Sequence, residues 1–267
     1  VFSGTLGGGL PAVFVREGDA APGTGGGVFD LFQAEAVNSA GEVAMRGTAR
    51  GTGITSANSE GIWTNSGGSL ELVAREGDPI PCLPAPLAGL VAFSRFTTLA
   101  IADDGSVCFF AYLRNASGPG PVNSTNDGSI WRWEDGELYL VAREGDAANN
   151  TDGGAIRRLD GFACSGTGGV VYQVQYVVGQ GDATSANRDG IYLDRGAADA
   201  APELVLRRGD TFDFRGETRE VGALKISTEE NSGGGTGGYG RAINDTGGIL
   251  LNLSLSGNLT GLFVLSP

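Results

Sequence analysis

The tetrapeptide Arg-x-Gly-Asp is the first candidate for chemistry, because a guanidinium and a carboxylate at this spacing can hold charged ligands or pair with each other. It closes an apolar run four times, at intervals of 59 to 68 residues, with its arginines at Arg16, Arg75, Arg143 and Arg207. An active site is assembled once from unlike residues, so recurrence indicates a structural role. We expect each arginine to pair with a carboxylate and each aspartate to cap the following loop. The adhesion tripeptide Arg208-Gly209-Asp210 is interpreted as part of the fourth copy.

Charge and composition exclude several other kinds of site. The 267 residues include no His, which excludes the Ser-His-Asp triad, Cys-His pairs and zinc sites that use histidine. The formal net charge is −13, which argues against nucleic acid as a partner, because phosphate binding needs a basic face. Two carboxylates alone could hydrolyse a glycoside, so a hydrolase stays open as an alternative. The acidic residues, however, lie in repeated turns or variable loops, and no catalytic residue is assigned.

Oxygen ligands near turns raise the question of calcium. Asp103-Asp104 and Asn126-Asp127 could supply such ligands, although neither matches the spacing of an EF-hand loop. Ordinary turn chemistry explains these residues, and a structural calcium ion remains the alternative. We expect no other metal and no cofactor.

Aromatic residues recur at one position of a second motif, Ser-x-Asn followed by a small, an aliphatic and an aromatic residue. The aromatics at this position are Trp63, Trp131, Tyr192 and Phe263. We expect them to pack in the core between repeats; the alternative is that such a ring is exposed and stacks on sugars. Trp133 breaks the pattern. It follows Trp131 by two residues, hence on the same strand face, and is expected to be the exposed aromatic.

The three cysteines allow at most one internal disulfide. Cys108 follows a predicted turn and Cys164 precedes the equivalent turn of the next repeat, so both are expected near the same face of consecutive repeats. We predict a Cys108–Cys164 bridge, with Cys82 left over. The alternative is three buried thiols that behave as small apolar side chains.

The elements that position these residues form four copies of one unit. A turn opens onto an apolar strand at residues 36–45, 100–109, 163–172 and 242–251, and the Ser-x-Asn motif follows at 56–63, 124–131, 185–192 and 256–263. No segment has helical periodicity. Four antiparallel strands in about 64 residues match a propeller blade, so we predict an all-β, four-bladed β-propeller. Residues 1–267 form one repeat domain, with repeats at about 20–78, 79–146, 147–210, and 211–267 plus 11–19.

The chain begins and ends out of phase with its repeats. It starts with the motif of a fourth strand, residues 13–19, and ends with the motif of a third strand. We expect the N-terminal strand to complete the last blade, either within the chain or in a neighbouring chain. Two loops differ between repeats, at residues 78–95 and 227–241. Such insertions either carry binding or are flexible solvated loops.

The turn motif also carries a family resemblance. Asn38-Ser-Ala-Gly41 followed by Val43-Ala44-Met45, and Asn244-Asp-Thr-Gly247 followed by Ile249, resemble the tandem NxxGxxxAF repeats of bacterial choice-of-anchor surface proteins. Ala102 and Ser165 depart from that pattern. The resemblance implies a secreted or surface-attached protein with no established activity. The Ser-x-Asn stretch is similar to the Asp-box of sialidase-type propellers, a structural hairpin that implies no sialidase activity.

These observations favour a function outside the cell. The start at Val1 fits a mature chain whose signal was removed, and no 18-residue apolar run could span a membrane. We expect a non-enzymatic, secreted or cell-surface protein with a structural or adhesive role, such as a subunit of an extracellular fibre or matrix. Its partners would be further copies or other cell-surface components. A carbohydrate-binding propeller with glycan partners is the alternative, and a glycoside hydrolase is a third.

Overall fold

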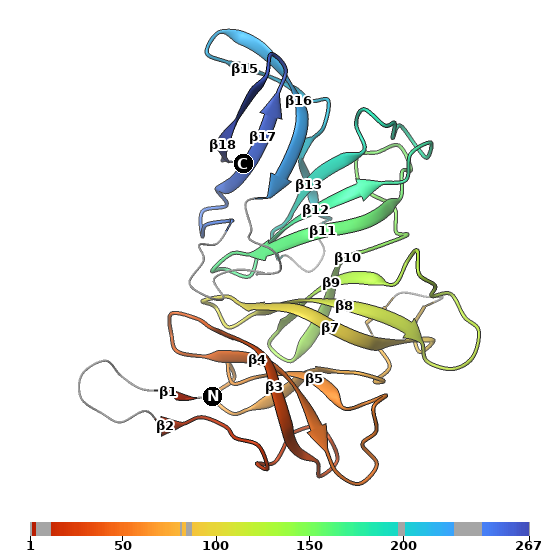
Figure 1. Cartoon of the computed structure of the whole chain (residues 1–267), viewed down its shortest axis with the longest axis vertical. Helices are drawn as coiled ribbons and strands as arrows, with labels where there is room; N and C mark the ends of the chain where they lie inside the picture. The colour runs from red at the N-terminus through yellow and green to blue at the C-terminus, as the bar shows by residue number, and fades with distance from the viewer. Residues whose placement is uncertain are drawn as a thin grey trace.

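The computed structural model describes residues 2–3, 12–80, 82–83, 87–196, 201–226 and 242–266, and every regular element among them is a β-strand. Figure 1 shows four antiparallel sheets that follow one another in chain order. The predicted all-β fold is confirmed. The first sheet contains β3 (Val28–Val37), β4 (Val43–Arg50), β5 (Glu60–Thr64) and β6 (Glu71–Arg75). The second contains β7 (Val91–Ile101), β8 (Val107–Asn115), β9 (Gly128–Glu134) and β10 (Glu137–Arg143).

The third sheet contains β11 (Ile156–Cys164), β12 (Val170–Tyr176), β13 (Asp189–Asp194) and β14 (Glu203–Arg207). The fourth contains β15 (Thr211–Phe214), β16 (Glu217–Ile226), β17 (Ile249–Leu255) and β18 (Leu259–Leu265). A short hairpin of β1 (Phe2–Ser3) and β2 (Ala12–Val13) precedes them. In all four sheets the strands lie in chain order, which is the arrangement expected of a repeated unit.

The core lies between successive sheets. One cluster of buried residues joins the first and second sheets, another the second and third, and another the third and fourth. Strands of the inner sheets are therefore buried on both faces. This explains why β9, with the sequence GSIWRWE, is buried along nearly its whole length and does not alternate between apolar and polar residues.

The turn between the first two strands keeps one geometry in every repeat, even where the motif departs from Asn. The glycine N–H donates to the carbonyl three residues earlier, and the glycine φ lies between 76° and 90°: Gly41 to Asn38, Gly105 to Ala102, Gly168 to Ser165 and Gly247 to Asn244. A left-handed φ favours glycine at this position. The glycine therefore maintains the turn in the second and third repeats, where Asn is missing.

The fourth sheet is built differently from the prediction. Its extra strand, β15, pairs with the outer edge of β16, and β18 pairs only with β17 among the described strands. A strand equivalent to β6, β10 and β14 is therefore lacking in the described part of this sheet. Residues 12–13, which were predicted to complete it, pair instead with β1.

The four sheets form an open row, and the predicted closure into a propeller ring is not found. In Figure 1 the first sheet lies at the lower end of the row and the fourth at the upper end. The N-terminal segment packs on the first sheet, where Val15 is buried in a cluster with Phe29 and Trp63. This contact holds the segment away from β18, so completion of the last sheet within the chain was a wrong prediction for this structure.

Candidate functional site

The two recurrent motifs form one structural lock in each of the first three sheets. The arginine Nε of Arg-x-Gly-Asp donates to the main-chain carbonyl of the Asn in Ser-x-Asn: Arg75 to Asn58 at 2.7 Å, Arg143 to Asn126 at 3.1 Å and Arg207 to Asn187 at 2.8 Å. The Asn side chains meanwhile accept the N–H of the residue three positions earlier, which holds the turn. The motifs thus fasten the end of the fourth strand to the preceding hairpin.

Three of the four arginines also pair with carboxylates, as predicted: Arg16, Arg143 and Arg207; among the described residues no ion pair involves Arg75. Arg207 makes a bidentate contact with Asp182, at 2.6 and 3.0 Å, and Arg143 lies 3.2 Å from Asp146. The Arg207 guanidinium lowers the pKa of the Asp182 carboxyl. At Asp146 burial dominates and raises the pKa, against the opposing effect of Arg143.

The predicted role of the motif aspartate was only partly right. Its backbone N–H donates to the arginine carbonyl in all four copies, at 3.1 to 3.3 Å. The carboxylate of Asp210 accepts the N–H of Arg207 at 2.7 Å, so it closes its own turn and does not cap the loop that follows. The Arg208-Gly209-Asp210 tripeptide is part of this turn, as interpreted from the sequence.

Hydrogen bonds connect the glycine turns from one sheet to the next. Asn38 donates from Nδ2 to the carbonyl of Ala102 at 2.9 Å, and the N–H of Ser39 donates to the Asp103 carboxylate at 2.9 Å. The N–H of Asp104 then donates to the Gly166 carbonyl at 3.0 Å. The turns therefore form a continuous line along the row.

The residues named for calcium belong to two kinds of turn: Asp103 and Asp104 to the glycine turn of the second repeat, and Asn126-Asp127 to the Ser-x-Asn stretch before β9. Asp103 accepts the Ser39 N–H, Asp104 accepts the Ser106 N–H at 2.9 Å, and Asn126 donates to the carbonyl of Pro121 at 2.9 Å. Within the part of the chain that the structure describes, no three His, Cys, Asp or Glu side chains gather as metal ligands would.

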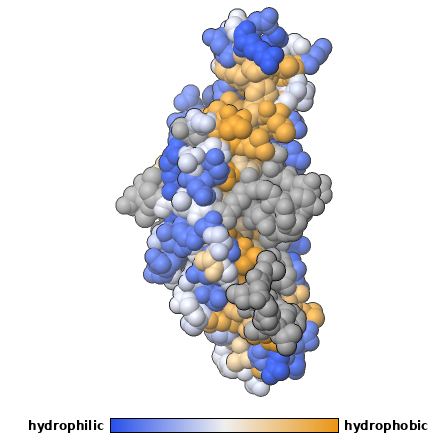
Figure 2. Space-filling model, turned by 90° about the vertical axis from the view of Figure 1, so that its left-hand side faces the viewer, coloured by the Kyte–Doolittle hydropathy of each residue, from blue (hydrophilic) through white to orange (hydrophobic). Residues whose placement is uncertain are grey.

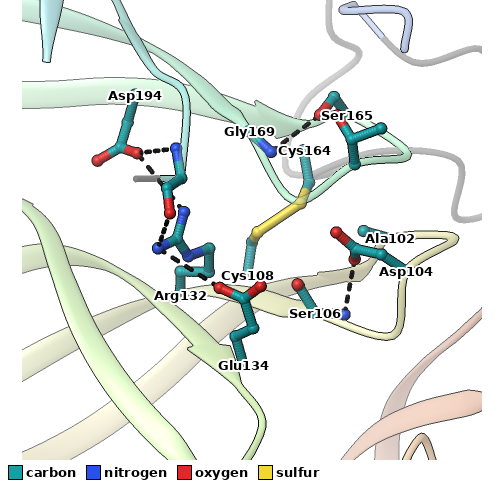
Figure 3. The surroundings of a disulfide bond; sticks show 12 residues. Ala102, Asp104, Ser106, Cys108, Arg132, Glu134, Cys164, Ser165, Gly169 and Asp194 are labelled. Atoms are coloured by element: carbon teal, nitrogen blue, oxygen red, sulfur yellow. Dashed lines mark hydrogen bonds and ion pairs between the residues drawn. A yellow bond between two sulfur atoms is a disulfide. The ribbon is translucent and has the colours of Figure 1, made fainter. Parts of the chain in front are cut away.

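The second and third sheets are joined by the predicted disulfide, which is confirmed. Cys108 on β8 and Cys164 on β11 are bonded, with their Cα atoms 6.4 Å apart, and both residues are buried (Figure 3). Cys82 is exposed and carries a free thiol, as expected of the cysteine left over.

A buried arginine lies beside this disulfide (Figure 3). Arg132 on β9 donates from Nη2 to the Gly196 carbonyl at 2.8 Å, and its guanidinium lies 3.6 Å from both Asp194 and Glu134. Its charge also lies over the ring of Tyr139, 5.0 Å from the ring centre. Burial raises the pKa of Asp194, while the Gly196 N–H and Arg132 act in the opposite direction. This network binds the second sheet to the third.

A cleft of about 320 Å³ opens on the other face of the second sheet, between its turns and those of the first sheet. Its lining includes Glu71, Asp104, Trp133, Glu134 and Asp135. Ser106 also lines it, is 2% exposed, and has a hydroxyl oxygen with no hydrogen-bond partner among the described residues. Carboxylates beside an indole edge can accept hydrogen bonds from hydroxyl groups of a neutral ligand.

The aromatic predictions had mixed outcomes. Trp63, Trp131 and Tyr192 are at most 2% exposed and pack in the core, as predicted, while Phe263 in the fourth sheet is half-buried. Trp133 was predicted to be exposed, and this is wrong, because it is only 5% exposed. The first sheet covers the face of β9 that Trp133 shares with Trp131.

Sequence reasoning missed Arg132, the cleft and the Arg–Asn lock. The lock had a signal, the near-constant separation of 17 to 20 residues between the Asn and the Arg. Of the two variable loops, residues 227–241 lie outside the described residues. The loop at 78–95 contributes the buried Ile80 and Leu83 to the core between the first two sheets.

Comparison with known proteins identifies the family of this chain but assigns it no activity. No helix among the described residues is long and apolar enough to cross a membrane. No curated protein matches the chain. A family model matches residues 1–267, and the chain belongs to that family, DUF7453, described as a family of unknown function.

Proposed function

We propose that this protein is a non-enzymatic structural component outside the cell, a subunit of a surface fibre or matrix. The observation that carries the proposal is the outer edge of β18, in the fourth sheet. β18 is paired on one edge only among the described strands, and it exposes Leu262 by 66% and Val264 by 69%. Soluble monomers avoid open sheet edges with apolar side chains, because such edges invite pairing with another chain.

The recurrent motifs support the same proposal. The arginines, aspartates and asparagines that could have formed a repeated binding site are used in turns and in the lock between strands. The likeness of the turns to NxxGxxxAF repeats favours a location at the cell surface. Together these features suit a scaffold whose role is to span and connect.

Negative-stain electron microscopy of native, unheated protein, combined with light scattering over a range of concentrations, tests this proposal. We expect ordered fibres or rings and a scattering mass that rises with concentration. A monomer of 27.2 kDa at every concentration would contradict it.

Carbohydrate binding is the second candidate, and the cleft beside Trp133 favours it. A glycan array tests it with the variants Glu71→Gln and Asp135→Asn, which remove carboxylates from the cleft. Asp152→Asn is the matched control for Asp135→Asn. Both aspartates have a left-handed φ, 46° at Asp152 and 50° at Asp135, but Asp152 does not line the cleft. Specific binding lost in the first two variants only would support a lectin. A screen of chromogenic glycosides tests the third alternative, a glycosidase.

A further inference from the structure

The two ends of the row expose positions that are buried in every inner sheet. We call the face of each sheet that packs on the next sheet its forward face. In the third strand, one forward position holds Ile62, Ile130 and Ile191, all 0% exposed, and Leu262 in the fourth sheet, 66% exposed. The position two residues later is at most 3% exposed in the first three sheets, whereas Val264 is 69% exposed. An apolar patch over the upper end of the row is visible in Figure 2.

The opposite end has the complementary feature. We call the face that packs on the preceding sheet the back face. On this face the residues that pair with the first residue of β8, β12 and β17 are Ile101, Cys164 and Ile243, which are 1 to 2% exposed. The equivalent residue of the first sheet, Val37, is 65% exposed. The register fixes this equivalence, since Val37 pairs with Val43 as Ile101 pairs with Val107.

The N-terminal segment prepares the back face of the first sheet for a preceding sheet. The N–H of Gly18 donates to the Phe29 carbonyl at 2.9 Å, as the N–H of Gly77 donates to the Phe93 carbonyl at 2.9 Å. Residues 14–19 therefore contact the first sheet in the same way as the end of the fourth strand of one sheet contacts the next sheet. They correspond to the fourth strand that is lacking in the described part of the fourth sheet.

We propose that the forward face of the fourth sheet packs on the back face of the first sheet in a second copy of this chain. The contact would repeat the one already made three times within the chain, which is why a second copy is the occupant. Within the first sheet, Gly61 of the third strand pairs with Arg75 of the fourth. The same register between copies would pair Gly261 of one copy with Arg16 of the next. β18 would then replace β1 as the strand that pairs with β2. Such a head-to-tail interface is heterologous and extends into fibres or rings. This inference rests on the proposed function and supplies its interface.

The natural disulfide shows how to test the contact. Cys108 lies on the forward face of the second sheet and Cys164 on the back face of the third. In the fourth sheet the position equivalent to Cys108 is Leu250, because Leu250 pairs with Val264 as Cys108 pairs with Arg132. In the first sheet the position equivalent to Cys164 is Val37. A cysteine at each should therefore meet across two copies. The background is Cys82→Ser, which removes the exposed free thiol.

The experiment mixes chains carrying Val37→Cys with chains carrying Leu250→Cys under mild oxidation. We expect a disulfide-linked dimer on a non-reducing gel only in the mixture, and a ladder of multimers from the double variant. Val178→Cys is the matched control for Val37→Cys, because it replaces the same residue type, 50% exposed, in the loop after β12. The inference would be overturned if the mixture gave no more disulfide-linked dimer than the control mixture with Val178→Cys. It would also be overturned if the two cysteines of the double variant linked within one chain.

A second pair of variants separates the interface from the function. Leu262→Lys and Val264→Lys place charge on exposed side chains, so the fold should persist, and assembly should need on the order of tenfold more protein. If the wild-type chain assembles while these variants assemble equally well and the mixture does not link, the interface is wrong and the structural function stands. If the wild-type chain stays monomeric, both fail.

Discussion

Removal of the Cys108–Cys164 disulfide should destabilise the protein strongly, because the bond closes a long stretch of chain. The two cysteines are 56 residues apart in sequence. The loop-closure relation for a loop of that length gives about 4 kcal/mol at 25 °C. Both side chains are buried, so the double variant Cys108→Ala/Cys164→Ala also leaves small cavities. We expect a loss of about 4 kcal/mol in the free energy of unfolding.

Urea unfolding followed by intrinsic fluorescence measures this loss, and the same change should follow when the wild-type protein is reduced. Cys82→Ser is the control, and we expect it to shift the free energy by less than about 0.5 kcal/mol because Cys82 is exposed. Thiol titration in denaturant should find one free thiol. Three free thiols, or a loss below about 1 kcal/mol in the double variant, would refute the reasoning.

Further predictions compare equivalent positions along the row. Ile62→Ala should cost about 2–5 kcal/mol of unfolding free energy in monomeric protein and Leu262→Ala less than about 1, because only the first is buried, as thermal unfolding would check. Asn38→Ala should cost about 1–3 kcal/mol more than Asn244→Ala, because only the Asn38 side chain bonds to the next sheet among the contacts described; equal losses would contradict this. Stability should fall as pH rises above the ordinary aspartate range, because burial raises the pKa of Asp194 and the folded state binds its proton more tightly than the unfolded state; Asp194→Asn should flatten that slope. Assembly should strengthen with added salt, since copies with a net charge of −13 repel each other, and light scattering at two salt concentrations would detect the opposite trend.

The sequence was sufficient to predict the strands and turns that recur in every repeat, because their signals are local. Glycine at a left-handed φ marks each turn, and this holds even where Ala102 or Ser165 replaces Asn. The disulfide could also be predicted, because Cys108 and Cys164 occupy opposite sides of the same turn in consecutive repeats. Repetition turns a local pattern into a three-dimensional one.

The sequence could not show which sheet, if any, covers a given face of another sheet. Trp133 was expected to be exposed because it lies outside the aromatic position that recurs in every repeat, yet the first sheet covers it. The same problem affects closure, because a ring and an open row use identical contacts between neighbouring sheets. The β15–β16 hairpin was overlooked, although Arg215 and Gly216 form its two-residue turn with positive φ values.

The stacking of sheets in a row has a consequence for the order in which the molecule opens. Each sheet packs on its chain neighbours, so local opening should start at the two ends and move inward, as in other repeat proteins. Amide hydrogen exchange should therefore be slowest around β8 and β11, which the disulfide joins at the middle of the row. β3 and β17 should exchange fastest among the long strands in monomeric protein. Joining copies end to end would remove both free ends and even out the exchange rates along the chain.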